Sequence, residues 1–211
     1  MPPNKEPVVF IARHGRTILN ATNKFRGNSN PVLDSVGLEQ AQELSDLFKS
    51  IDISHIFCSD KIRATKTAEI ISSSKNIPVH KSESLRALNV GEFSGQDRNK
   101  KSEADLQSYL DDPDTQIPGG ESLNDFRNRI RPCLQQSIEI FMDCGVPPLL
   151  VAHSSVCHEI GNIATGNHKS ILVEPGGAIA VYFDPSTQSI SANPIFKPVK
   201  SLPGNQASVI T

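Results

Sequence analysis

The stretch VFIARHGRTILN, residues 9–20, begins as an apolar strand and changes abruptly at residues 13–16 to the run RHGR. The apolar run Val8–Ala12 is long enough for a strand and has no polar interruption, which predicts a strand buried on both faces. The chain has only six histidines. One of them, His14, stands between two arginines directly after this strand. We therefore expect chemistry at the carboxyl end of the strand.

The composition indicates one globular domain that spans residues 1–211, with loose tails at about 1–6 and 199–211. Charged residues make up 21% and hydrophobic residues 37%, the two signs are mixed, and the net charge is −2. Without a basic face or tail, nucleic acid is not an expected partner. No apolar stretch is long enough to span a membrane, and no secretion signal is visible, so we expect a cytoplasmic protein.

The four cysteines show no paired spacing that would indicate a disulfide framework or a zinc site. We expect all of them to be reduced thiols. The oligomeric state stays open, because a final strand exposed at the edge of a sheet could pair with a second chain in a homodimer.

Helical and strand patterns alternate along the chain, which predicts a three-layer α/β sandwich with a mostly parallel central sheet and helices on both faces. Asp34 should open the first long helix, and Ser59 should cap a helix that ends at Ser73. The stretch 77–95 reads as polar and irregular. The remaining expected elements are a strand at 55–59, helices at 102–110 and 122–142, a strand within PPLLVAH (147–153), a helix from residue 154, and a closing hairpin of residues 178–184 and 189–196.

Three of the predicted strands end next to residues that suit phosphate chemistry. Arg13 and His14 follow the first strand, Arg63 lies just inside the helix after the second, and His153 follows LLVA. In open α/β sheets, ligands bind outside the carboxyl ends of the strands, so these side chains should meet at one edge of the sheet.

A phosphate monoester carries close to two negative charges, and the planar guanidinium of arginine can bind its oxygens in a bidentate manner. Arg13 and Arg63 fit this role. A neutral imidazole is a competent nucleophile, so His14 is the candidate for a covalent intermediate. His153 could donate to the phosphoryl oxygens, Gly15 would let the backbone approach the anion, and the helix that starts at Ser154 presents free N–H groups.

Each of these residues also has a purely structural interpretation. A histidine at a strand end can be an ordinary buried side chain, and we assign such a role to His55, His80, His158 and His168. A metal site is not expected, since no carboxylate or thiol at metal-ligand spacing accompanies His14 or His153, and adjacent guanidinium groups repel a cation.

Six motifs run in order along the chain, namely RHGRTILN (13–20), FRGNSNPVLDSVGLEQA (25–41), SDKIRATKTAE (59–69), LRALNVGEFSG (85–95), PGGES (118–122) and VAHSS (151–155). With this ordered set the chain resembles the histidine phosphatase superfamily, in particular its phosphoglycerate-mutase-like branch of small-molecule phosphatases. The resemblance implies that His14 is the phosphorylated residue, that Arg13, Arg63 and His153 complete the phosphate pocket, and that no cofactor or metal is needed. It also implies that Asn20, Arg26, Gly27 and Ser154 line the pocket.

The chain departs from the pattern of this branch at two positions. Ala87 stands where members usually carry the glutamate that acts as general acid, and Ser94 stands where a second glutamate is usual. Loss of a general acid typically costs about 10²- to 10⁴-fold in rate, most for alkyl phosphates with strongly basic leaving groups. Three explanations stay open, namely an engineered change, a phosphate-binding protein without turnover, or a replacement acid among Glu83, Glu92, Asp97 and Glu121.

The segment between Gly95 and Pro118 bears on the choice between a mutase and a phosphatase. It is short and holds one arginine and two lysines. A mutase needs further cationic groups to hold the carboxylate of its substrate, so hydrolysis of a small phosphorylated metabolite is favoured. A phosphoprotein phosphatase is a weaker alternative, because no docking surface for a protein substrate is recognisable.

Overall fold

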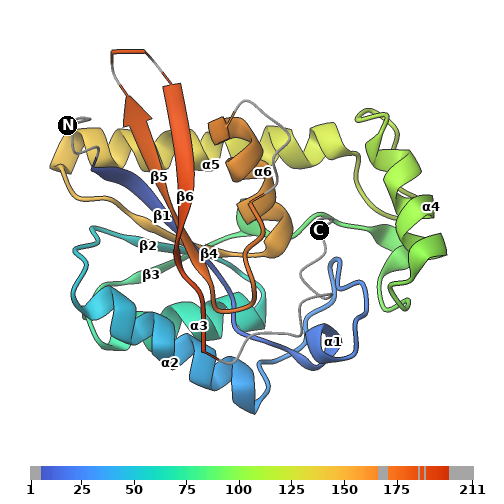
Figure 1. The fold of residues 1–211 in the computed structure, drawn as a ribbon, viewed down its shortest axis with the longest axis horizontal. Coiled ribbons are helices and arrows are strands. Elements are labelled where there is room, and N and C mark those ends of the chain that lie inside the picture. Colours follow the sequence, from blue (N-terminus) through green and yellow to red (C-terminus); the bar gives the residue numbers. More distant parts are fainter. Residues whose placement is uncertain (1–5, 166–170, 185, 188, 200–211) are drawn as a thin grey trace.

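The computed structural model describes residues 6–165, 171–184, 186–187 and 189–199. It contains one six-stranded sheet in the order β3-β2-β4-β1-β5-β6 (Figure 1). The first four strands in this order are parallel, and β5 and β6 join as an antiparallel hairpin. This confirms the expected mostly parallel sheet and the closing hairpin. The strands are β1 (Pro7–Arg13), β2 (Ile56–Ser59), β3 (Val79–Ser82), β4 (Leu149–Ala152), β5 (Ala178–Asp184) and β6 (Ser189–Phe196).

Helices cover both faces of the sheet, as the sequence predicts (Figure 1). Along β1, Val9 and Ile11 pack into the core cluster shared with α5 and α6, whereas Phe10 and Ala12 pack into the cluster shared with α2 and α3. Successive side chains of a strand point to opposite faces. Both faces of β1 are therefore buried, which explains its continuous apolar run. The helices are α1 (Ile18–Ala21), α2 (Ser35–Lys49), α3 (Ile62–Ser73), α4 (Lys100–Leu110), α5 (Leu123–Cys144) and α6 (Ser154–Thr165).

The helix starts confirm some of the sequence predictions and correct one. Asp34 caps α2 by accepting a hydrogen bond from the Gly37 N–H at 2.8 Å. Ser59 does not cap α3, since that helix begins only at Ile62 after Lys61, whose side chain makes no capping bond. The two residues after Ser59 form a bend instead, in which Asp60 pairs with Arg86.

The stretch 77–95 contains a strand that the sequence did not predict. Strand β3 has the sequence VHKS, and it lies at the edge of the sheet. An edge strand has one paired side and a solvated face, so it needs little apolar character. The rest of the stretch includes two short 3₁₀ helices, Glu83–Leu85 and Gly91–Phe93.

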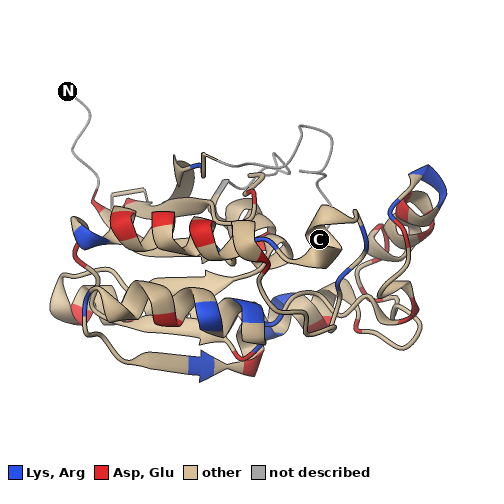
Figure 2. Cartoon of the chain, turned by 90° about the horizontal axis from the view of Figure 1, so that it is seen from below, with Lys and Arg blue, Asp and Glu red and all other residues tan. Residues whose placement is uncertain are grey.

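The expected terminal tails lie outside the described residues except for Glu6 and Val199. No helix of the described chain is long and apolar enough to cross a membrane. The cysteines are free thiols, as predicted. Figure 2 shows that both acidic and basic residues occur on the helices in view.

Candidate active site

The register of the central strands brings the two candidate histidines to one edge of the sheet. Arg13 at the end of β1 pairs with Ala152 at the end of β4. The His14 N–H donates to the Ala152 carbonyl at 3.0 Å. The rings of His14 and His153 lie with their centroids 5.1 Å apart. The structure thus brings together the two histidines that are 139 positions apart in the sequence.

Two contacts of the His14 ring determine which nitrogen carries the proton. Nδ1 lies 2.7 Å from the Gly15 carbonyl, which can only accept, so Nδ1 is the protonated nitrogen. The Arg63 Nε–H donates to Nε2 at 3.1 Å, so Nε2 carries the lone pair. Burial, followed by the charges of Arg63 and Arg13, holds the pKa of His14 well below its usual value. The imidazole is therefore neutral at neutral pH, with a lone pair on Nε2 suited to attack.

Two buried arginines supply the positive charge near this imidazole. Arg63 is 1% exposed and donates through Nη1 to the Ser29 carbonyl at 2.7 Å. Arg13 is buried as well, and its Nη1 donates to the Val173 carbonyl at 2.6 Å. Burial lowers the pKa of each guanidinium to about 10. Both groups therefore remain charged at neutral pH, and their charge is little screened by water.

His153 precedes α6, and its carbonyl accepts the hydrogen bond from the Cys157 N–H at 3.0 Å. Its ring is buried, and neither ring nitrogen has a hydrogen-bond partner among the described residues. Burial and the nearby Arg63 lower the pKa of this imidazole well below its usual value. A buried polar group without a partner is rare and calls for an explanation. Binding to the oxygens of an anion in the adjoining pocket would satisfy it.

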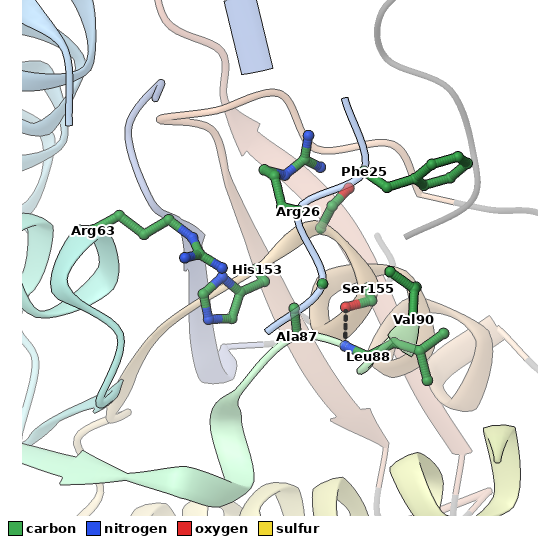
Figure 3. Close-up of a pocket in the computed structure, with 10 residues that line it drawn as sticks. Phe25, Arg26, Arg63, Ala87, Leu88, Val90, His153 and Ser155 are labelled. Carbon is green, nitrogen blue, oxygen red and sulfur yellow. Dashed lines mark hydrogen bonds between the residues drawn. The ribbon is translucent and has the colours of Figure 1, made fainter. Parts of the chain in front are cut away.

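A pocket opens beside Arg63 and His153 (Figure 3). His14 does not itself line it, but it contacts both of these residues. Arg26 enters from the loop after α1, and Figure 3 shows the Arg63 guanidinium directed toward His153. Of the residues that the sequence predicts for the pocket, five line it, namely Arg26, Gly27, Arg63, His153 and Ser154, and Ala87 lines it at the predicted acid position.

Arg13, which was also predicted for the pocket, is not among the residues that line it. Three more predicted residues have other places. Gly15 lies beside the pocket and donates its N–H to the Thr67 hydroxyl at 3.2 Å. Asn20 is buried and accepts hydrogen bonds from the N–H and the hydroxyl of Thr17, while its Nδ2 has no partner among the described residues. Glu92 is exposed, and it is not among the residues that line the pocket.

The other candidate acids also lie outside this pocket and are paired with cations. Glu83 pairs with Arg86 at 3.0 Å, and Asp97 pairs with Lys24 at 2.8 Å. Glu121 pairs with Arg129 at 2.7 Å.

The remaining histidines do not join the site. His55, which directly precedes β2, and His80 on β3 form a group of rings with Phe57. His158 contacts Asn162 through Nε2 at 3.1 Å. His168 lies outside the described residues. Among those residues, no group of histidine, cysteine, aspartate or glutamate could hold a metal ion.

Sequence analysis missed Arg129 and the apolar part of the pocket. Arg129 donates to the carbonyls of Ser84, Arg86 and Ala87, each at 2.8 Å, and so holds the Ala87 segment in place. It lies in the middle of a long helix, where nothing in the local sequence distinguishes it from a solvated arginine. The missed apolar lining residues are Phe25, Leu88 and Val90.

The backbone of the loop that carries His14 packs directly on the start of α2. A Cβ on Gly37 would lie 2.0 Å from the Arg16 carbonyl oxygen, and one on Gly15 would lie 2.2 Å from the Gly37 oxygen. Both contacts involve backbone atoms, which cannot rotate away as the end of a side chain can. The two glycines therefore allow the close approach that fixes the loop carrying His14.

Gly37→Ala is expected to lower the free energy of unfolding by about 1–3 kcal/mol, because the added methyl group forces the loop and α2 apart. Chemical denaturation measures the effect. Gln42→Ala, on the exposed face of the same helix, is the matched control and should change stability by no more than about 0.5 kcal/mol. Equal stability of the Gly37→Ala variant and the parent would contradict the packing.

The neutral histidines also predict how stability depends on pH. His14 and His153 remain uncharged in the folded protein, whereas in the unfolded chain they take up protons near their usual pKa of 6.5. The unfolded state therefore binds more protons as the pH falls below 6.5, and stability falls with it by up to about 1.4 kcal/mol per pH unit for each histidine. Chemical denaturation between pH 7.5 and about 5 measures the free energy of unfolding and tests the expected loss of stability.

A double variant, His14→Asn and His153→Asn, removes both titrating groups and should show a shallower loss of stability over the same pH range. An unchanged slope in the double variant would show that other groups cause the acid destabilisation.

A neutral imidazole beside buried guanidinium groups, at the carboxyl ends of parallel strands, is an arrangement suited to binding and transferring a phosphoryl group. The chain belongs to the histidine phosphatase superfamily (branch 1), whose family model matches residues 9–174. That match runs from β1 to the segment before β5 and includes His14 and His153.

Relatives in sequence include proteins named as probable phosphoglycerate mutases. A probable phosphoglycerate mutase GpmB of Proteus mirabilis is 34% identical over 149 residues, which cover 69% of this chain and 68% of that protein. The corresponding protein of Salmonella choleraesuis is 32% identical over the same length.

Solved structures share the fold. A mycobacterial glucosyl-3-phosphoglycerate phosphatase in complex with VO3 superposes with a TM-score of 0.76 at 21% identity, covering 91% of this chain and 99% of that one. The α-ribazole phosphatase of Shigella flexneri gives 0.72 at 22% identity, covering 89% and 95%. A phosphoglycerate mutase of Bacillus anthracis gives 0.72 at 21% identity, covering 89% and 92%. At this level of identity the likeness concerns the fold alone.

Proposed function

We propose that the protein is a phosphomonoesterase that hydrolyses a small phosphorylated molecule through a phosphohistidine intermediate on His14. The carrying observation is the His14 ring, whose Nε2 holds a lone pair between buried cationic groups. In the first step the Arg63 Nε–H moves from Nε2 to a phosphoryl oxygen, which frees the Nε2 lone pair to attack phosphorus. Arg13, Arg63 and His153 stabilise the charge on the phosphoryl oxygens. In the second step water attacks the phosphohistidine and releases phosphate. None of the groups assigned to these steps requires a cofactor.

The segment between Gly95 and Pro118 supports hydrolysis over mutase transfer. It contributes no residue to the described lining of the pocket. Its arginine, Arg98, pairs with Glu103 at 3.2 Å and stacks over the Phe25 ring at 5.1 Å. Its lysines, Lys100 and Lys101, are exposed. These cations are thus not placed to hold the carboxylate of a phosphoglycerate in the pocket.

The direct test is release of inorganic phosphate from p-nitrophenyl phosphate, with 3-phosphoglycerate as the separate probe of mutase activity. We expect His14-dependent phosphate release. Conversion of 3-phosphoglycerate to its 2-isomer without phosphate release would instead identify a mutase. Cytoplasmic location and a homodimer remain predictions, to be checked by fractionation and by light scattering.

A second candidate function is a protein that binds a phosphorylated ligand without turning it over. The observation that favours it is the lack of a carboxylic acid among the described residues of the pocket. Binding of a phosphate ester without phosphate release, even with an activated aryl ester, would support this candidate over the first.

A further inference from the structure

Two hollows meet at Ala87, which lines both of them. The inner hollow is the phosphate pocket, with a cavity volume of about 20 Å³. The outer hollow has a volume of about 250 Å³ and is lined in part by Asn28, Asn89 and Arg129. On the proposed function, the phosphoryl group lies in the inner hollow beside Arg63. The group to which it is bonded then extends past Ala87 into the outer hollow.

The described lining of the inner hollow holds no strong proton donor for the leaving oxygen. It contains no aspartate, glutamate, cysteine or tyrosine. Arginine keeps its proton under ordinary conditions, so Arg26 and Arg63 can stabilise a negative charge but do not act as acids. His153 is a neutral imidazole, which can donate a hydrogen bond but is a weak acid.

The outer hollow has two carboxylates, Glu83 and Glu121, and both are engaged by cations. Glu121 accepts hydrogen bonds at both oxygens: Oε1 from Arg129 Nη2 and from the Asn89 N–H, each at 2.7 Å, and Oε2 from Arg129 Nε at 3.0 Å. Glu83 pairs with Arg86, and its side chain is 76% exposed. Neither carboxyl group is arranged to donate a proton into the inner hollow.

Nearby Asp60 is also unsuited to be the acid. It accepts two hydrogen bonds from the Arg86 guanidinium, and this pairing lowers the pKa of its carboxyl group. It lines neither of the two hollows.

The backbone around Ala87 is fixed on both sides. Arg129 binds the carbonyls of Ser84, Arg86 and Ala87. The Leu88 N–H donates to the Ser155 hydroxyl at 3.0 Å, a bond that Figure 3 shows at the wall of the pocket. A segment anchored in this way does not swing a distant side chain into the place of Ala87.

We infer that the substrates are activated phosphoryl compounds, whose leaving group departs as a stable anion without a proton from the protein. Aryl, enol and acyl phosphates share this chemistry, whereas simple alkyl phosphates do not. This inference rests on the proposed function and narrows its substrate class.

The step balances without an acid. The His14 Nε2 lone pair forms the bond to phosphorus as the bond between phosphorus and the leaving oxygen breaks. The electron pair remains on that oxygen, which leaves as a phenolate, enolate or carboxylate. Water then attacks phosphorus, the pair of the N–P bond returns to Nε2, and the proton of the water passes to phosphate or to solvent.

The test is the dependence of kcat/KM on the basicity of the leaving group, since kcat/KM includes every step up to departure of that group. A series of substituted phenyl phosphates, acetyl phosphate and glycerol phosphate covers the range. We expect a steep fall in kcat/KM as the leaving group becomes more basic, with glycerol phosphate slowest. Equal kcat/KM for glycerol phosphate and p-nitrophenyl phosphate would overturn the inference.

Ala87→Glu and Ala87→Gln form a matched pair, because the two side chains have similar size and only glutamic acid can donate a proton. Ala87→Glu should raise kcat/KM for glycerol phosphate by about 10²- to 10⁴-fold, a larger factor than for p-nitrophenyl phosphate. Ala87→Gln should give no such gain. An equal gain in both variants would overturn the inference, because it would reflect packing rather than proton donation.

Failure of the inference and failure of the proposed function give different results. A shallow dependence on the leaving group, together with His14-dependent turnover, rejects only the inference. Absence of turnover and of a phosphorylated His14 with every substrate rejects both. The dependence of kcat/KM on leaving-group basicity, measured with the parent protein, tests the inference even if an Ala87 variant fails to fold.

Discussion

His14→Ala is expected to lower kcat/KM for p-nitrophenyl phosphate by at least about 10⁴-fold, the scale seen when an enzyme loses its nucleophile. No other described imidazole can replace it in attack, because His153 lies 5.1 Å away between ring centroids and does not occupy the position between Arg63 and Gly15. Phosphate release, measured over the background rate, gives the effect.

His80→Ala is the matched control, since this histidine is exposed on β3 and takes no part in the site. It should retain the parent activity. If His14→Ala and the parent released phosphate equally fast, His14 would not be the nucleophile.

Arg63→Ala should lower kcat/KM by about 10³- to 10⁵-fold, the range reported for a guanidinium that stabilises a transferring phosphoryl group. Arg63 both lines the pocket and contacts the nucleophile, so its loss removes charge stabilisation and frees the His14 ring. Arg63→Lys keeps a charge but loses the planar, bidentate geometry, and it should recover only a small part of the activity.

The pH dependence of kcat/KM separates a role of Arg63 in the reaction from a merely structural role. Arg63 is the largest charged contributor to the low pKa of His14, after burial. Removing this positive charge raises that pKa, so the acid limb of kcat/KM for Arg63→Ala should move to higher pH. Arg131→Ala, at an exposed position of α5, should leave both rate and profile unchanged. An unshifted acid limb in Arg63→Ala would contradict the assigned contact.

The sequence predicted the core of the fold well because its signals are local. The apolar run of β1 and the capping Asp34 each follow from a few adjacent residues, and both predictions were confirmed. Strand β3 was missed because an edge strand with the sequence VHKS carries no periodic apolar signal. The predicted Ser59 cap was wrong because a two-residue bend separates that residue from α3.

The candidate site likewise contains residues that the sequence could predict and residues that it could not. His14, Arg63 and His153 could be predicted because strand ends in a parallel sheet converge, so topology alone placed them together. The anchoring by Arg129 depends on how α5 packs against the segment around Ala87, and no local pattern encodes that contact. The ion pairs of the candidate acids could not be predicted from the sequence either, since only the folded chain shows that Glu121 pairs with Arg129.

The most direct test of the central claim is to trap the phosphorylated protein. The parent is mixed with p-nitrophenyl phosphate and quenched within the first turnover under alkaline conditions, which preserve phosphohistidine. The modified residue is then mapped by mass spectrometry. The account predicts phosphate on Nε2 of His14, with none in His14→Ala. Stoichiometric phosphate on another residue, or turnover with no phosphorylated residue, would contradict it.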